Sequence, residues 1–123
     1  MAGNLVHFEI PSKDTGRAKE FWGSLFGWEF QSWEGANEYH MISGTEPGGG
    51  LYPTQGGESG LTVYFDTDDV AETAGRVESL GGKVVMPKTP IPTIGYFAIC
   101  EDTEGNPFAL FQADEGAPAP EPA

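Results

Sequence analysis

The stretch HFEIPSKDTGRAKEFWGSLFGWEF, His7 to Phe30, indicates a repeated architecture, because its pattern recurs in TVYFDTDDVAETAGRVESLGGKVV, Thr62 to Val85. The two stretches align without a gap, so that Asp14 falls on Asp69. Each reads as a strand of alternating residues, a polar turn, an amphipathic helix and a further strand. Two copies of one unit in a chain of 123 residues predict a pseudo-twofold architecture, with any functional site where the copies face each other.

Each copy is expected to contain a strand, a helix and three more strands. The first copy has a strand at 5–10, a helix capped by Ser12 or Asp14 and ended by Gly27, and strands at about 28–33, 38–43 and 51–53. The second has a strand at 61–66, a helix capped by Asp69 and ended by Gly81 and Gly82, and strands at 83–87, from about 96, and at 107–113. The prediction is an α+β fold of two tandem βαβββ modules that form a curved mixed sheet, with helices outside and a central cup.

Alternation along the two opening strands assigns their side chains to faces. The apolar rows Val6/Phe8/Ile10 and Leu61/Val63/Phe65 should pack on the helices, and the rows Leu5/His7/Glu9 and Thr62/Tyr64/Asp66 should line the cup. In the first helix, Ala18, Phe21, Trp22 and Leu25 recur at helical spacing and are expected in the core. A polar concavity at a repeat interface is the best candidate for a ligand site.

The length fits a single domain at 1–113, with modules at about 4–53 and 61–112 joined by the turn-forming linker 54–60. The acidic, Pro- and Ala-rich residues 114–123 are predicted to be a disordered tail.

The net charge of −13 argues against binding to nucleic acid or to anionic membranes, because only six Lys and Arg side chains are available. A single cysteine, Cys100, excludes an intrachain disulfide and is expected to be a small buried hydrophobic residue. The sequence shows neither a signal peptide nor a membrane span, so a cytoplasmic location is expected.

The chain resembles the vicinal oxygen chelate superfamily, which includes glyoxalase I, extradiol dioxygenases and bleomycin resistance proteins. The resemblance rests on VHFEI followed by KEFWGSLFGWEF, on DTDDVAETAGRVESLGGKV, and on the closing EDTEGNPFALFQ, and it covers about residues 5–112. Within this superfamily the chain is most similar to small single-domain glyoxalase-like proteins of unassigned activity. The resemblance implies a homodimer.

The resemblance also implies a divalent metal held by four residues, two from each module. Of these four positions only His7 carries a suitable side chain, since the others fall on Thr62, Ala109 and a position near Gly50. One imidazole cannot hold a labile divalent ion well. A relocated site of His7, Glu9 and Asp66 is the alternative that would retain a metal.

His7 and Glu9 are the best catalytic candidates, because a carboxylate two residues along the strand could support an imidazole acting as a base. The other histidine, His40, is expected alone on the surface. Tyr39 and Trp33 are further aromatic candidates for the cup. The residues expected to contact a ligand are His7, Glu9, Thr62, Tyr64, Asp66, Tyr52, Tyr96, Ala109 and Phe111.

The sequence therefore predicts a metal-independent small-molecule binding protein without a cofactor, which binds a partly aromatic, neutral or cationic ligand in the cup. The alternative is a metal-dependent lyase, isomerase or dioxygenase with a non-standard ligand set around His7. Two further hypotheses stay open: a metal-independent enzyme that uses His7 and Glu9 as base, and a domain whose cup is filled by its own side chains and which binds a partner protein.

Overall fold

The computed structural model describes residues 3–33, 35, 37–54 and 60–118. The chain forms two compact units, Val6–Val63 and Tyr64–Ala123, the second of which also takes in Met1–Leu5. The N-terminal residues belong to the second unit because they form backbone hydrogen bonds with Asp66. Gly3 N–H donates to Asp66 O at 2.9 Å, and Asp66 N–H donates to Asn4 O at 2.9 Å. The units correspond closely to the two sequence copies.

The first module contains β1 (Leu5–Ser12), α1 (Thr15–Phe26), β2 (Glu29–Ser32), β3 (His40–Ser43) and β4 (Gly49–Pro53). Its strands are arranged in the order β2-β3-β4-β1, with β1 parallel to β4 and the other neighbours antiparallel. The second module contains β5 (Thr62–Asp66), α2 (Val70–Ser79), β6 (Lys83–Ile91), β7 (Gly95–Glu101) and β8 (Pro107–Ala113). Its order is β5-β8-β7-β6, again with one parallel pair, β5 and β8.

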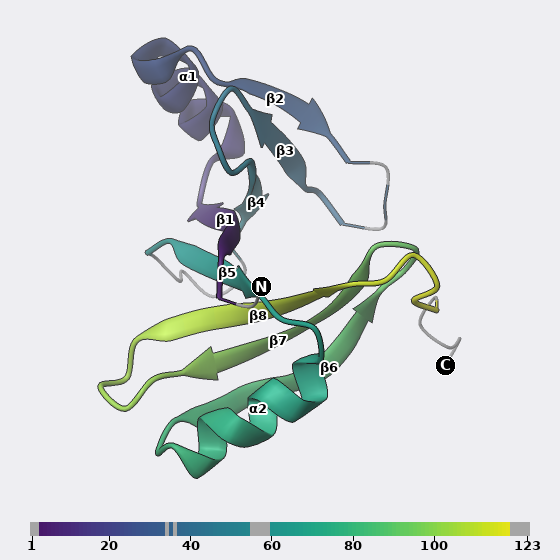
Figure 1. Ribbon diagram of the computed structural model, residues 1–123. Coiled ribbons are helices and arrows are strands. Elements are labelled where there is room, and N and C mark those ends of the chain that lie inside the picture. The colour runs from purple at the N-terminus through teal and green to yellow at the C-terminus, as the bar shows by residue number, and fades with distance from the viewer. Residues whose placement is uncertain (1–2, 34, 36, 55–59, 119–123) are drawn as a thin grey trace. The chain divides into compact units, whose positions relative to one another are not determined.

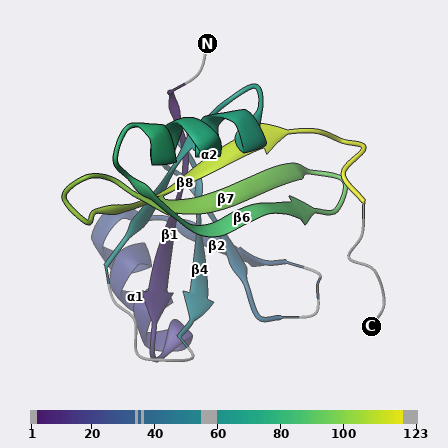
Figure 2. The same ribbon diagram turned by 90° about the horizontal axis from the view of Figure 1, so that it is seen from below.

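The second module therefore repeats the first element by element, and the prediction of an α+β fold with two βαβββ modules is confirmed. In both views α2 lies across β6, β7 and β8 (Figures 1 and 2). The cup expected between the modules stays a prediction. Of the expected linker 54–60, residues 55–59 lie outside the described residues.

The ends of both helices follow the sequence rules. Asp14 caps α1 by accepting a hydrogen bond from Arg17 N–H at 2.9 Å, and Asp69 caps α2 by accepting from Glu72 N–H at 3.1 Å. At the end of α1, Gly27 has φ of 75°, a left-handed conformation that glycine adopts without a steric penalty. A second side chain binds the N-terminus of α2, since the side-chain oxygen of Gln112 in β8 accepts a hydrogen bond from Val70 N–H at 2.9 Å.

Each helix covers one face of its own sheet. In the first module the core is formed by Ile10, Ile42 and Leu51, with Phe8, Ala18, Trp22, Trp28 and Phe30 packed against it. In the second module it is formed by Val70, Ala74, Ala98, Cys100 and Leu110, with Val77, Val84, Tyr96 and Phe108 packed against it. The expected burial of Phe8, Ile10 and Trp22 on the helix side is confirmed.

Part of the expected helix stripe is wrong. Phe21 and Leu25 are exposed by 58% and 55%, and Leu61, expected on the helix side of the second module, is exposed by 54%. Ala18 and Trp22, four residues apart, direct α1 toward its core, so Phe21 lies to one side of this line. The helical period of 3.6 residues predicted which side of α1 is apolar. It did not predict how wide a part of that side is buried against the core of the first module.

Residues 114–118 are ordered, although the sequence predicted that a disordered tail begins there. The carbonyl oxygen of Ala117 accepts from Thr93 N–H at 3.1 Å, and Asp114 N–H donates to Ile94 O at 2.9 Å. Ala117 is only 5% exposed. The chain after β8 thus packs on the turn between β6 and β7, and residues 119–123 of the predicted tail lie outside the described residues.

Across residues 3–33, 35, 37–54 and 60–118, the helices are too short and too polar for any of them to cross a lipid bilayer.

Candidate ligand-binding site

Tyr39 joins the two strongest sequence candidates, His7 and Glu9. The Tyr39 hydroxyl donates to Glu9 Oε2 at 2.8 Å, and His7 Nε2 lies 2.9 Å from the same hydroxyl oxygen. Because a phenol has a single O–H proton, its oxygen must accept from His7, so that Nε2 carries the hydrogen. The result is a directed chain of hydrogen bonds from the imidazole through the phenol to the carboxylate. His7 and Glu9 are about a quarter exposed, at 25% and 21% of their side-chain surface.

Strand register explains why these three residues meet. Phe8 and Ile10 pack toward α1, so the alternating neighbours His7 and Glu9 point to the opposite face of the sheet. Glu9 lies opposite Gly50 in β4, and Gly50 lies opposite Met41 in β3. Tyr39, two residues before Met41, shares its face and reaches across β4 to β1.

Gly50 makes this reach possible. A Cβ atom built at Gly50 would fall on the phenol oxygen and Cζ of Tyr39, and 2.7 Å from its Cε1. Any residue other than glycine would therefore displace the ring. The group that approaches the Gly50 backbone is the Tyr39 ring. Tyr52, two residues further along β4, lies on the same face as Gly50.

In the second module, the face turned away from α2 carries most of the other expected ligand contacts. Tyr64 lies opposite Ala109, and Asp66 lies opposite Phe111, so these four side chains share one face. Tyr64 and Ala109 are buried, at 7% and 0% exposure. Thr62 begins β5 and is half-buried. The predicted alternation is thus confirmed for Tyr64 and Asp66.

Tyr96 does not share this face, and the expectation that it does is wrong. Tyr96 lies opposite Gln112, whereas Phe111 lies opposite Phe97, so Tyr96 and Phe111 point to opposite sides of the sheet. Tyr96 packs against the core under α2, and Lys88 Nζ lies 4.3 Å from the centre of its ring. A tyrosine in a strand cannot be assigned to a face until the register with its neighbours is known.

Trp33 directly follows β2 in the first module and is 45% exposed. Its backbone N–H donates to Tyr39 O at 2.8 Å.

Asp66 serves the backbone of its own module. One carboxylate oxygen, Oδ1, accepts from Asn4 N–H at 2.8 Å, next to the ladder contacts that Asp66 makes with Gly3 and Asn4. Its carboxylate therefore fixes the start of the chain. This is a structural role that spacing along β5 did not suggest.

The residues present do not fit the divalent metal that the family resemblance implies. A metal bound through His7 Nε2 would have to displace the hydrogen bond between this nitrogen and the Tyr39 hydroxyl, which are 2.9 Å apart. The three other implied positions fall on Thr62, on Ala109 and near Gly50, where the sequence supplies no strong ligand. Over residues 3–33, 35, 37–54 and 60–118, no three His, Cys, Asp or Glu side chains are grouped as a metal site would require.

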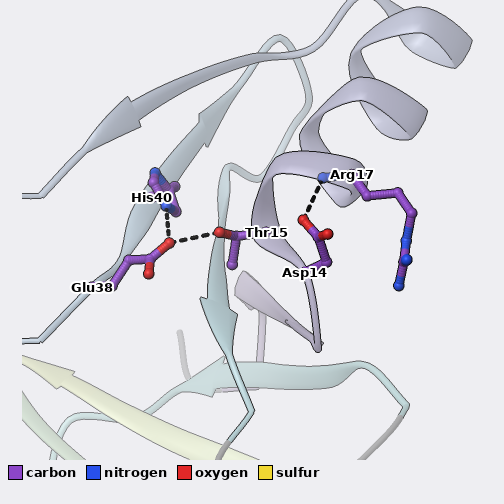
Figure 3. A network of polar contacts seen from close by, with 5 residues as sticks. All are labelled: Asp14, Thr15, Arg17, Glu38 and His40. Atoms are coloured by element: carbon purple, nitrogen blue, oxygen red, sulfur yellow. Dashed lines mark hydrogen bonds and ion pairs between the residues drawn. The ribbon is translucent and has the colours of Figure 1, made fainter.

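A second polar network lies at the N-terminal end of α1, on the helix side of the first module (Figure 3). Glu38 Oε2 accepts from Thr15 Oγ1 at 2.6 Å and lies 2.7 Å from His40 Nε2. These hydrogen bonds, first from Thr15 and then from His40, lower the pKa of Glu38 below its ordinary value of 4.5. The expectation that His40 lies alone on the surface is wrong, since it is 7% exposed and paired with Glu38.

The network joins the start of α1 to the start of β3, and its position explains why His40 is buried. His40 lies opposite Leu51 of the core, so its ring points to the side that α1 covers.

Cys100, in the second module, is fully buried. Burial, and to a smaller extent the nearby charge of Glu78, raises the pKa of its thiol above the ordinary value of 9.0. The prediction that Cys100 is a buried hydrophobic residue is confirmed.

Comparison with known proteins agrees with this architecture. The sequence profile of the Glyoxalase/Bleomycin resistance protein/Dioxygenase superfamily matches residues 4–110. A glyoxylase-like domain-containing protein of Didymella fabae is 31% identical over 119 residues, which cover 88% of this chain and 92% of that protein. The anthracycline biosynthesis protein DnrV of Streptomyces peucetius is 29% identical over 129 residues, and the match covers 89% of this chain but only 47% of DnrV.

Among solved structures, the Mn(II)-bound glyoxalase from Novosphingobium aromaticivorans superposes with a TM-score of 0.68 at 19% identity. The superposition covers all of this chain and 43% of that protein, and it shows a shared fold. The match of the profile to nearly the whole domain, together with the repeated βαβββ modules, establishes that this chain belongs to the Glyoxalase/Bleomycin resistance protein/Dioxygenase superfamily.

Proposed function

We propose that this protein is a metal-independent small-molecule binding protein of the glyoxalase/bleomycin resistance type. The observation that carries the proposal is the hydrogen-bonded chain of His7, Tyr39 and Glu9. His7 occupies one of the implied metal positions, and its imidazole forms a hydrogen bond with the Tyr39 hydroxyl. The same face offers a carboxylate, a phenol and an imidazole, which bind polar groups of an organic ligand.

The ligand is expected to be partly aromatic and either neutral or cationic. Glu9 carries negative charge into this face, and the chain as a whole has a net charge of −13, which disfavours anions. Tyr39 and Tyr52 lie on the face and supply rings for stacking. The similarity to DnrV, an anthracycline biosynthesis protein, directs the search toward polycyclic aromatic compounds.

The direct test is a binding titration with the anthracycline daunorubicin, which is aromatic and carries a cationic amine. Its fluorescence should change on binding to the wild type, and the melting temperature of the protein should rise with ligand concentration. Glu9→Gln removes the carboxylate charge and should weaken binding by about ten-fold, in line with a lost charge-assisted hydrogen bond. Glu29→Gln is the matched control, since Glu29 is an exposed residue of β2 in the same module.

The competing function is a metal-dependent lyase, isomerase or dioxygenase with a ligand set around His7. The fold shared with a Mn(II)-bound glyoxalase is the observation in its favour. Metal analysis after equilibration with Mn, Zn, Ni or Fe salts separates the two functions. Our proposal expects less than stoichiometric metal in the wild type, and one equivalent that is lost in His7→Ala would refute it.

We also propose that the protein is a homodimer. The chain spans 47% of DnrV, so two copies would match the length of that relative. Sedimentation velocity would measure the assembly state, and a monomer at micromolar concentration would contradict this part of the proposal.

A further inference from the structure

Tyr39 and Gly50 compete for one space. The Tyr39 ring lies against the backbone of Gly50, and a Cβ atom at position 50 would coincide with the end of the phenol. Gly49, the neighbouring residue, is also tightly held, since its Cβ would approach the Phe8 ring to 2.7 Å on the other face. Gly50, and not Gly49, therefore lies against the Tyr39 ring on the side of the sheet that carries His7 and Glu9.

The space beside Gly50 is filled by the Tyr39 hydroxyl, which forms two hydrogen bonds. The Tyr39 hydroxyl donates to Glu9 and accepts from His7. A side chain starting at Gly50 would have to expel this hydroxyl, and it would then begin within reach of the same two partners. The choice at position 50 is thus between a β4 side chain and the phenol.

We infer that Tyr39 and Gly50 act as one unit that sets the ligand class of this site. By occupying the space of a β4 side chain, the phenol keeps a third metal-ligating group away from His7 and Glu9. It presents an uncharged hydroxyl beside a carboxylate, a combination suited to organic ligands with N–H or O–H donors and unsuited to divalent cations. The inference rests on the proposed function and names Tyr39 as a specificity-determining residue.

The first experiment measures the coupling between the two positions by urea unfolding. All three tryptophans, Trp22, Trp28 and Trp33, lie in the first module, so their fluorescence reports its unfolding. Gly50→Ala should raise the unfolding constant by about ten- to a hundred-fold through overpacking. In a Tyr39→Ala background the same change should raise it by less than about three-fold. Equal effects in both backgrounds would overturn the inference.

The second experiment tests the ligand class with MnCl2 by isothermal titration calorimetry. The double variant Tyr39→Ala/Gly50→Glu places a carboxylate beside His7 and Glu9 in the space of the phenol, and it should bind Mn(II) at least about ten-fold more tightly than the wild type. Adding His7→Ala to this variant should abolish the gain. Tyr39→Ala alone is the control, because it opens the space without supplying a ligand.

The two proposals fail in different ways. Stoichiometric Mn(II) in the wild type would refute the proposed metal-independent function. A wild type that binds no Mn(II), with a folded Tyr39→Ala/Gly50→Glu variant that also binds none, would refute the role of Tyr39 and Gly50 and leave the proposed function standing. Circular dichroism and the fluorescence transition establish that each variant is folded before the titration.

Discussion

Replacing Trp22 with alanine is expected to destabilise the first module by about 3 kcal/mol. Trp22 packs against the core of Ile10, Ile42 and Leu51, and its ring stacks on Trp28 with centroids 5.1 Å apart and an angle of 9° between the planes. About 100 Å² of apolar surface removed from water contributes roughly 2.5 kcal/mol, and the stacked pair adds about 0.5 to 1 kcal/mol.

Phe21→Ala is the matched control. Phe21 is the adjacent aromatic residue in α1, but it is 58% exposed, so its removal should cost less than about 1 kcal/mol. Both substitutions gain a similar amount of helix propensity, so the difference between them isolates packing.

The assay is urea unfolding followed by tryptophan fluorescence, with Trp28 and Trp33 remaining as reporters in Trp22→Ala. Equal slopes with denaturant and a lower midpoint for Trp22→Ala would support the estimate. If Trp22→Ala cost no more than Phe21→Ala, the stacked pair would not stabilise the module, and the reasoning from burial would be refuted.

Two further predictions follow from the pKa shifts. The buried thiol of Cys100, whose pKa is raised by burial and by Glu78, should not react with DTNB in the native protein and should react fully in urea; fast native modification would contradict its packing. The lowered pKa of Glu38 stabilises the fold fully above its ordinary value of 4.5, and this stabilisation is lost as the pH falls through the lower folded value. The advantage of wild type over Glu38→Gln in urea midpoint should therefore shrink between about pH 5 and about pH 3, and a constant gap would argue against the hydrogen bonds from Thr15 and His40.

The repeat, the helix caps and the alternation of β1 could be predicted from the sequence because they depend on neighbours along the chain. Asp14 and Asp69 each cap a helix through an N–H three residues away, and Gly27 ends α1 by its own conformation. Alternation in β1 placed His7 and Glu9 on the face away from α1, and they lie there.

The partners of these residues could not be predicted in the same way. Tyr39 lies 30 or more residues from Glu9 and His7, and it reaches them only because β4 runs between β3 and β1 with glycine at position 50. No local pattern in the sequence pairs Tyr39 with Gly50, because 11 residues separate them along the chain. The prediction for Tyr96 was wrong for a related reason, since the register of β7 with β8 determines on which face of the sheet Tyr96 lies.

The two βαβββ modules, the caps of their helices and the residue types at the four implied metal positions follow from the amino-acid sequence alone, because each depends on local spacing or residue identity. The contacts beside Gly50 depend on the packing of the strands and could not be predicted from local spacing. The phenol of Tyr39 fills that space because strand order and register bring distant residues within hydrogen-bonding distance, and a glycine backbone leaves room for the ring.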